Sequence, residues 1–232
     1  MLHTEEAVRA AVRVKDGARV YYLPEGDRLT PSARDWLRSE NIRILTPQDA
    51  PKTYTTLFGA TLTEKPEHMT HLHGNVLVFK SHPRIAFRGM IDALEAEILL
   101  CQKAAERERH TQTVADLQEI LDFVRNLIRA DVLGEPVRNL KLCGLDADAL
   151  REHSHHPEKY YGQPHFMPSY TDGETLLQLN RVRTLVRRTE LSCYRAFSDP
   201  DGAVTREDMI LALNRLSSLC WILMIRLKAG QH

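Results

Sequence analysis

Apolar residues recur at helical spacing along most of the chain from about Ile85 onward. Three stripes advance alternately by three and four residues: Phe87, Ile91, Leu94, Ile98 and Cys101; Val114, Leu117, Leu121, Val124 and Ile128; and Met209, Leu213, Leu216, Cys220, Leu223 and Leu227. This spacing puts each stripe on one face of a helix that packs against partner helices. A further helix is expected from about Gly173 to Ala196. Residues 81–232 are therefore predicted to fold as an all-α bundle of four or five helices with ferritin-like up-down packing.

Two local signals refine this bundle. The sequence Thr205-x-x-Asp208 is close to a capping box and predicts the start of the last helix. Between Asp131 and Tyr170 the chain is rich in Gly, Pro and His, and only residues 146–153 read as a short helix. A connection this long within a bundle is often functional.

The first 55 residues have a different pattern and predict a small α+β appendage. A helical stretch over residues 4–14 precedes a strand at 18–23, and a second strand is expected at 42–45. Thr30 followed by Pro31 has the residue types of an N-cap and a first helical position. Residues 47–78 show no clear period, so 56–80 is predicted to be an irregular linker and active-site segment.

Composition narrows the classes of function. Hydrophobic residues make up 43% of the 232 residues and charged residues 27%, which is ordinary for a globular protein. The chain carries 31 basic and 31 acidic residues, so it lacks the basic excess of a typical nucleic-acid-binding protein. The longest apolar run, residues 219–225, is too short to cross a membrane, and the N-terminal residues lack the apolar region of a signal peptide. Four scattered cysteines without a Cys-x-x-Cys pair favour a reducing, cytoplasmic setting.

A polar stripe crosses the helix expected after Gly173. It comprises Asn180, Arg183, Arg187, Glu190 and Tyr194, again stepping by three and four. One interpretation is a solvated face with ion pairs between successive turns. The other is the polar wall of a cleft in which guanidinium groups hold phosphates. The sequence has neither G-x-x-x-x-G-K-[ST] nor G-x-G-x-x-G, so any nucleotide is bound without a P-loop or Rossmann turn.

Two more segments carry polar residues beside apolar stripes. Asn214 lies in the last helix, where an amide serves either as a buried hydrogen bond that fixes register or as a contact to a base or sugar. Asp92 flanks the first stripe, and an acid in that position favours an Arg from another helix as its partner. Lys80, Arg84 and Arg88 make the start of that helix basic.

The histidines raise the question of a metal site. Two groups stand out in the sequence: His68, His71 and His73, and His153, His155 and His156. Neither has a cysteine partner or a helical His-x-x-x-His with an acid, which a closed site would favour. We therefore predict no protein-bound metal and treat these residues as solvated loop histidines.

Taken in chain order, three segments resemble the corrinoid adenosyltransferases of the propanediol- and ethanolamine-utilisation types. They are Lys80-x-x-Pro83-Arg84-Ile85 with Gly89-x-x-Asp92-x-Leu94, then the run from Arg183 to Glu190, and then the run from Leu213 to Ser217. The resemblance extends over most of the chain from about Lys65. Residues 29–35 and 130–136 look more like the ethanolamine-utilisation branch.

The resemblance implies a transferase that moves the 5′-deoxyadenosyl group of ATP to Co(I) of a corrinoid and releases triphosphate. It also implies a homotrimer with active sites between subunits, with ATP as cosubstrate, Mg²⁺ as cofactor and cobalamin as substrate. Asp92 would pair with Arg183, and Glu190 would support the arginines. Lys80, Arg84, Arg187 and Asn214 would contact ATP.

The resemblance also assigns the corrinoid side of the site. An apolar side chain under the corrin displaces the lower axial ligand in these enzymes, and Phe166 is the candidate here. The propanediol-type pattern has Phe one residue earlier, where this chain has His165, so Met167 is the second candidate. The N-terminal Thr/Gly-rich phosphate loop of that type has no counterpart here. Residues 58–66 also lack the cysteines that accompany a metal-binding His in some ethanolamine-branch members.

Two other functions remain open at this point. The chain is a non-catalytic adenosylcobalamin carrier or corrinoid-sensing protein if it binds corrinoid without turnover. It is a plain helical interaction module if it binds neither ligand. A reductase and an adenosylcobalamin-dependent lyase are candidate partners of the transferase, and association with a bacterial microcompartment is left open.

Overall fold

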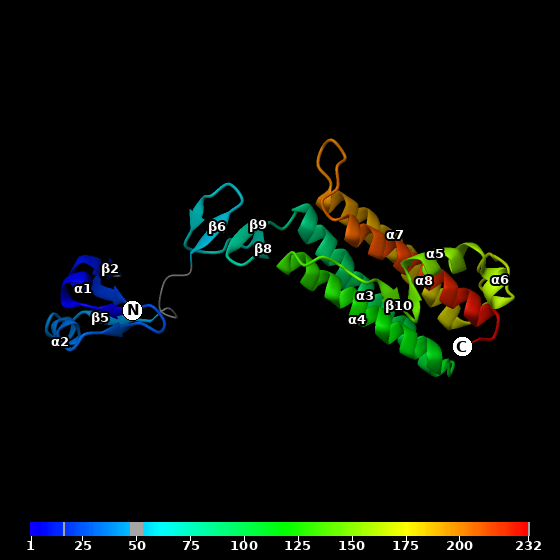
Figure 1. Ribbon diagram of the computed structural model, residues 1–232, viewed down its shortest axis with the longest axis horizontal. Helices are drawn as coiled ribbons and strands as arrows, with labels where there is room; N and C mark the ends of the chain where they lie inside the picture. Colours follow the sequence, from blue (N-terminus) through cyan, green and yellow to red (C-terminus); the bar gives the residue numbers. More distant parts are fainter. Residues whose placement is uncertain (16, 47–52, 232) are drawn as a thin grey trace. The chain divides into compact units, whose positions relative to one another are not determined.

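A computed structural model describes residues 1–15, 17–46 and 53–231 of the chain (Figure 1). The described residues form eight helices and eleven short strands. They divide into two compact units, Met1–Lys65 and Pro66–His232. The sheets correct the all-α prediction, because strands are present in both units and not only in the expected appendage.

The N-terminal unit contains two helices beside a three-stranded sheet. Its elements are β1 (Leu2–His3), α1 (Glu5–Ala11), β2 (Arg13–Lys15), β3 (Ala18–Tyr22), β4 (Arg28–Leu29), α2 (Pro31–Ser39) and β5 (Arg43–Leu45). The sheet order is β2-β3-β5, with β2 antiparallel and β5 parallel to β3, while β1 pairs with β4. Thr30 caps α2 by accepting a hydrogen bond from the Ala33 amide, and Pro31 follows it, as predicted.

A small apolar core holds this unit together. Its buried residues are Val8, Tyr21, Leu29, Ala33, Leu37 and Ile42. The side chains come from both helices and from the strands and turns between them. The α+β character expected for the first residues is therefore present, although the expected first helix ends at Ala11 and the chain continues as β2.

The segment expected to be irregular contains two hairpins. In the N-terminal unit β6 (Tyr54–Thr56) pairs with β7 (Thr61–Leu62), and in the second unit β8 (Met69–His73) pairs with β9 (Val76–Phe79). The prediction of an irregular segment is therefore wrong for these residues, and residues 47–52 lie outside those described. A register shift between His71 and His73 interrupts the alternation of buried and exposed positions in β8, which hides the strand in the sequence.

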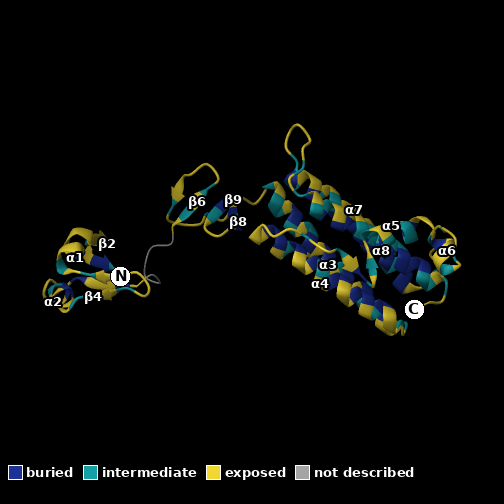
Figure 2. Cartoon of the chain, viewed as in Figure 1, coloured by how far each residue is buried: buried dark blue, intermediate teal, exposed yellow. Residues whose placement is uncertain are grey.

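The second unit is a helical bundle. Its helices are α3 (Pro83–Arg107), α4 (Thr111–Leu133), α5 (Ala147–His155), α6 (Pro157–Tyr161), α7 (Glu174–Phe197) and α8 (Glu207–Lys228). Helix α3 packs against α4 and α7, α7 packs against α8, and α5 packs against α8. A hairpin of β10 (Lys141–Leu142) and β11 (Leu145–Asp146) precedes α5. The buried positions face the inside of the bundle and the exposed ones face outward (Figure 2).

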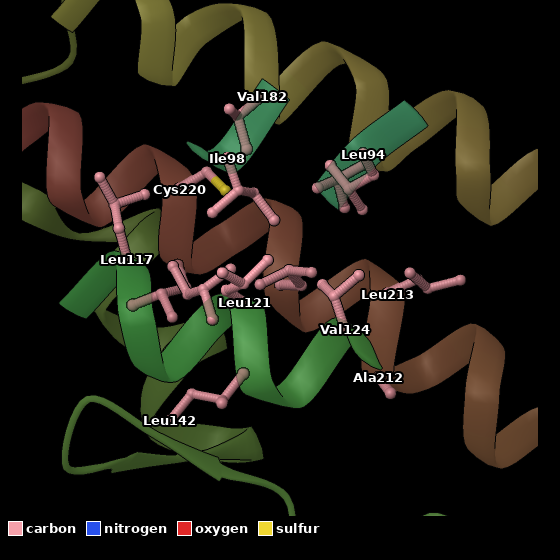
Figure 3. Close-up of a cluster of buried hydrophobic side chains, with 14 of the residues drawn as sticks. Leu94, Ile98, Leu117, Leu121, Val124, Leu142, Val182, Ala212, Leu213 and Cys220 are labelled. Atoms are coloured by element: carbon pink, nitrogen blue, oxygen red, sulfur yellow. The ribbon is translucent and has the colours of Figure 1, made fainter. Parts of the chain in front are cut away.

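The predicted stripes meet in one core. Side chains of Leu94 and Ile98 from α3 lie near those of Leu121 and Val124 from α4, with Leu213 and Cys220 of α8 beside them (Figure 3). All five residues of the first stripe are buried, as are five of the six in the last. At about 25 cal/mol per Å² of apolar surface, such burial is the main stabilising contribution to the bundle.

Two features of α8 differ from the prediction. Thr205 does not cap the helix, because its hydroxyl donates to the Phe197 carbonyl and the helix begins at Glu207. By length and composition alone α8 is also apolar enough to cross a membrane. The core helix of a bundle passes the same test, and ten residues of α8 are buried against its neighbours.

Candidate functional site

A cavity of about 650 Å³ opens between α7, α8 and the segment that follows α6. Helix α7 contributes Asn180, Arg183 and Arg187 to its wall. These residues lie at successive turns, about 4.5–6 Å apart along the helix axis, because they are spaced by three and four. The structure thus favours the cleft interpretation of the polar stripe over a face turned wholly to solvent.

Another part of the lining is aromatic. Trp221 of α8 stacks on Phe166 with ring centroids 5.2 Å apart and on His165 with centroids 5.8 Å apart. Phe166 is half-buried, whereas Met167 next to it is 89% exposed. Lys228 adds a cation 5.5 Å from the Phe166 ring, so the loop is anchored on α8 from two sides.

Arg183 is held in a fixed orientation at this cavity. Its Nε and Nη2 donate to Asn180 Oδ1 at 3.2 and 2.9 Å, and its guanidinium lies 5.8 Å from the centre of the Trp221 ring. Burial and then the neighbouring Arg187 lower the pKa of Arg183, and no acid among the described residues pairs with it. Such a desolvated, positioned guanidinium is suited to binding a phosphate or carboxylate.

One turn beyond Arg187, Glu190 joins α7 to α8. Its Oε1 accepts a hydrogen bond of 3.1 Å from Asn214 Nδ2. Arg215 Nη1 donates to Asn214 Oδ1 at 2.6 Å, and Arg215 Nε donates to the Ala147 carbonyl at the start of α5. Glu190 therefore orients Asn214 rather than an arginine of α7, and neither residue lines the cavity in this chain.

The expected pair of Asp92 and Arg183 does not form within this chain. Asp92 is exposed on α3, where its carboxylate has no hydrogen bond or ion pair with any described residue, and Arg183 binds Asn180 instead. Lys80 is exposed after β9 and also lies outside the cavity. The single chain thus brings together Phe166, Met167, Arg183 and Arg187 from the predicted set.

Arg84 is held in an ion-pair network away from the cavity of its own chain. Its Nε and Nη2 bind Asp131 Oδ1 at 2.9 and 2.6 Å, and Arg88 Nε binds the other carboxylate oxygen at 2.6 Å. The Asp131 carboxylate is fully buried. Arg84 also lies over Phe197, about 15 Å along α7 from Arg187. Within one chain this arginine stabilises the end of the bundle and does not face the cavity.

No group of three or more His, Cys, Asp or Glu side chains in residues 1–15, 17–46 and 53–231 is placed to hold a metal ion. His68 stacks on Phe79, His71 Nδ1 is 3.1 Å from the Gly74 carbonyl, and His153 contacts the Tyr161 hydroxyl. His155 and His165 line the cavity and a neighbouring hollow of about 620 Å³.

The four cysteines are free thiols. Burial raises the pKa of Cys220 to about 12, and burial likewise raises that of Cys193 to about 12. Their thiolate forms are therefore scarce at neutral pH, which argues against a nucleophilic role for Cys193 and Cys220.

Many protein families have a helical-bundle fold, and a match to a family model identifies the one to which this chain belongs. Residues 60–227 match the model described as cobalamin adenosyltransferase. The chain belongs to the cobalamin adenosyltransferase family. The resemblance found in the sequence is thereby confirmed, and the match covers all the residues that build the cavity.

Relatives of this adenosyltransferase extend over nearly the whole chain. It is 33% identical to the corrinoid adenosyltransferase EutT of Escherichia coli over 246 aligned residues, which cover 96% of this chain and 90% of that protein. It is 32% identical to EutT of Salmonella typhimurium over 254 residues, covering 99% and 92%.

Two solved structures share the fold. Both are variants of a PduO-type ATP:corrinoid adenosyltransferase from Lactobacillus reuteri complexed with cobalamin and ATP. They match with a TM-score of 0.50 and 16% and 17% identity, covering 71% of this chain and 89% and 87% of those chains. At these identities the likeness shows the fold alone.

The sequence did not reveal what several lining residues of this adenosyltransferase do in the cavity. Trp221 lies within an apolar run and reads as a core residue, although its ring is partly exposed and faces the cavity. Ser217 and Ser218 lie on the same side of α8. Asn180 was part of the polar stripe, yet its role as the acceptor for Arg183 needed the three-dimensional structure.

Proposed function

We propose that this chain is an ATP:cob(I)alamin adenosyltransferase, which transfers the 5′-deoxyadenosyl group of ATP to Co(I) of a corrinoid. The observation that supports this most directly is the cavity itself. Two arginines that have no acidic partner among the described residues, Arg183 and Arg187, line it together with the stacked rings of Trp221 and Phe166. One wall suits a polyphosphate and the other a large, flat apolar ring system.

The reaction forms a cobalt–carbon bond and breaks a carbon–oxygen bond. The electron pair of Co(I) attacks the 5′ carbon of ATP, and triphosphate leaves with the electrons of the broken bond. Negative charge therefore grows on the leaving oxygen. Guanidinium groups stabilise that charge, and Arg183, which Asn180 already orients, does so without having to reorganise; Arg187 adds a second positive charge one turn away.

Asn214 and Glu190 are proposed to complete the nucleotide side. The Asn214 amide nitrogen donates to Glu190 and joins α7 to α8 one turn beyond Arg187, and Arg215 donates to the oxygen of the same amide. An amide held on both sides is suited to reading one edge of a base or sugar. Glu190 then acts by positioning Asn214.

Phe166 is the proposed residue under the corrin, with Met167 as the second candidate. Phe166 is held by Trp221 and Lys228, while Met167 is almost fully exposed at the mouth of the cavity. An apolar group below the cobalt excludes a lower axial ligand, which makes reduction of Co(II) less difficult.

We further propose that Mg²⁺ enters bound to ATP. No carboxylate is among the residues that line the cavity, and Mg²⁺ in nucleotide sites is usually held by phosphates, water and one or two carboxylates. The ion would neutralise part of the triphosphate charge. Glu190, one turn away, is the nearest acid on this wall of α7.

A homotrimer with active sites between subunits is proposed as the working assembly. Asp92 and Lys80 are exposed and lie outside the cavity of their own chain, which leaves them available to a neighbour's cavity, whereas Arg84 is bound to Asp131. Leu99 and Leu100 on α3 are 46% and 56% exposed, an apolar surface that an interface would cover. A reductase and an adenosylcobalamin-dependent lyase are proposed partners in a cytoplasmic setting, with microcompartment association left open.

The assembly has a sharp test in mixed subunits. Asp92→Asn and Arg187→Ala should each be strongly impaired as homo-oligomers. If one site takes Asp92 from one subunit and Arg187 from the other, co-expression of the two variants restores part of the activity. Lack of recovery in verified mixed trimers would show that each site takes Asp92 and Arg187 from the same subunit, or that Asp92 is not part of the site.

The reaction itself is tested with purified protein, cob(II)alamin, MgATP and a strong reductant without oxygen. The visible spectrum should convert to that of adenosylcobalamin. Arg187→Ala should slow this conversion by about 10–100-fold, because a charge-assisted hydrogen bond is worth about 1.5–3 kcal/mol. Arg188→Ala is the matched control, since Arg188 is exposed on the same helix and does not line the cavity. Corrinoid binding without any ATP-dependent change would instead assign the chain as a carrier or sensor.

A further inference from the structure

The N-terminal unit carries a groove of its own, on residues that the transfer reaction does not use. It measures about 360 Å³ and lies between α2 and β5, which Figure 1 shows side by side. Its lining is Arg34, Leu37, Arg38, Asn41, Ile42 and Ile44. Leu37 and Ile42 form its apolar floor as part of the buried core.

One side of this groove is an unpaired sheet edge. The sheet order β2-β3-β5 leaves the outer side of β5 without a strand among the described residues. The Leu45 carbonyl accepts a hydrogen bond from the Leu23 amide, which follows β3. The backbone N–H and C=O of Leu45 therefore point toward the β3 side of the strand. Because successive residues of a strand alternate, the N–H and C=O of Ile44 point outward, toward the open edge.

The side chains along the groove add a second signal. The side chain of Ile44 is 39% exposed. Its register partner on β3 is Tyr21, whose side chain belongs to the core between the sheet and the helices. Because register partners point to the same face of a sheet, the Ile44 side chain also lies on the helix side. An apolar residue left exposed beside a free backbone edge is a liability unless something covers it.

The opposite side of the groove is cationic. Arg34 and Arg38 are spaced by four residues on α2 and project from the same face. Neither side chain has a hydrogen bond or ion pair with any described residue, whereas Arg9 and Arg19 of the same unit bind Glu5 and Glu40. The lining residues include no acid.

We propose that this groove binds an extended acidic segment of a partner protein, which adds as a strand beside β5. The Ile44 backbone supplies the ladder hydrogen bonds. Alternate side chains of the segment then enter the groove, where apolar ones contact Ile44 and acidic ones pair with Arg34 and Arg38. Strand addition of this kind draws affinity from the main chain and specificity from the pockets for alternate side chains.

The proposal is tested by fluorescence anisotropy on the full chain. The probe is a labelled peptide of about six residues that alternates glutamate and valine, matching the usual length of a strand. A peptide that alternates lysine and valine is the comparison, because it has the same apolar pattern with opposite charge. The acidic peptide should bind saturably and more weakly at high salt, and the basic peptide should not bind.

Charge reversal in the groove supplies the decisive variants. Arg34→Glu combined with Arg38→Glu should weaken binding of the acidic peptide by at least about tenfold. Arg28→Glu is the matched control, because Arg28 is exposed in the same unit, has no ion pair among the described residues and does not line the groove. Adenosyl transfer by all these variants should be unchanged, so the outcome does not depend on the transfer reaction.

A further variant tests the strand pairing. Ile44→Pro removes the outward N–H at an edge position, where proline is tolerated, and should abolish binding, while Ile44→Val should retain it. The proposal is overturned if both peptides bind alike, if neither binds at about 1 mM, or if Arg28→Glu weakens binding as much as the groove variants. It is also overturned if the groove variants change only the self-association of the chain, which would assign the groove to a second copy.

Discussion

Asn180 accepts both hydrogen bonds that orient the guanidinium of Arg183, from Nε at 3.2 Å and from Nη2 at 2.9 Å. The two residues are one turn apart on α7, so the helix itself sets their geometry. No acidic side chain neutralises Arg183 among the described residues. The arginine is thus positioned by a neutral amide and keeps its charge available for a ligand.

We therefore expect Asn180→Ala to impair the transfer reaction without disturbing the fold. Loss of the acceptor frees the guanidinium to adopt other rotamers, and kcat should fall about tenfold, equivalent to about 1.4 kcal/mol. Asn180→Asp keeps an acceptor at the same place and should recover most of kcat while raising KM for ATP, because it adds a negative charge near the phosphates. Equal effects of Ala and Asp on kcat would argue against a positioning role.

Phe166 and Met167, the two candidates for the residue under the corrin, can be distinguished by mutation. Phe166→Ala should lower both corrinoid affinity and the rate of adenosylation, because it removes a ring stacked on Trp221 at the cavity wall. Met167→Ala should have the smaller effect, since this side chain is 89% exposed and makes few contacts. Titration of cob(II)alamin and single-turnover rates measure the two effects. The reverse ranking would make Met167 the residue under the corrin.

The buried carboxylate of Asp131 predicts a stability effect. Asp131→Ala leaves Arg84 and Arg88 without their shared partner and should lower the free energy of unfolding by about 3–5 kcal/mol. Asp122→Ala on the exposed side of the same helix is the control and should cost less than about 1 kcal/mol. Urea unfolding followed by circular dichroism gives both values. A small loss at Asp131 would show that the network contributes little to the bundle.

The histidine that caps α3 predicts a pH dependence of stability. Burial, then the positive charges of Arg84 and Arg88, lower the pKa of His82, although Asp131 acts in the opposite direction. The unfolded chain, with a His pKa of about 6.5, therefore binds this proton more readily than the folded chain. The contribution of His82 to stability is present above about pH 6.5 and is lost as pH falls toward the lowered pKa of the folded state.

Replacing this histidine isolates its contribution. His82→Asn keeps a side-chain acceptor for the Arg84 amide and removes the titration. Melting temperatures measured from pH 7.5 to about pH 5 should decline less for His82→Asn than for the unmodified chain. His73→Asn, at an exposed position, is the matched control. An unchanged pH profile in His82→Asn would exclude His82 as the source.

The helical bundle was predictable because its information is local. The stripe from Phe87 to Cys101 repeats at the period of the helix, and the repeat alone identifies the buried face. The hairpin of β8 and β9 has no such repeat, since a register shift at His71 and His73 breaks the alternation and Leu77 and Val78 are buried in succession. Whether such a short segment forms a strand depends on the segments with which it pairs, and not on a repeat in its own sequence.

The residues of the candidate site were likewise predictable only where the information is local in the sequence. Periodicity identified Arg183 and Arg187, because both lie on one face of one helix. The partners of Arg84 and Asn214 were not predictable, since Asp131 and Glu190 come from other helices and their distances depend on packing. Trp221 was missed because an indole in an apolar run has the same sequence signature whether it fills a core or forms a wall.

Trp221 lies between the loop of Phe166 and the guanidinium of Arg183, and it contacts both. One indole thus supports the wall proposed for the corrin and the wall proposed for the phosphates. A ligand that shifts this ring by binding on one side changes the affinity of the other side. Thermodynamic reciprocity requires the same factor in both directions, so any cooperativity between corrinoid and ATP must be mutual.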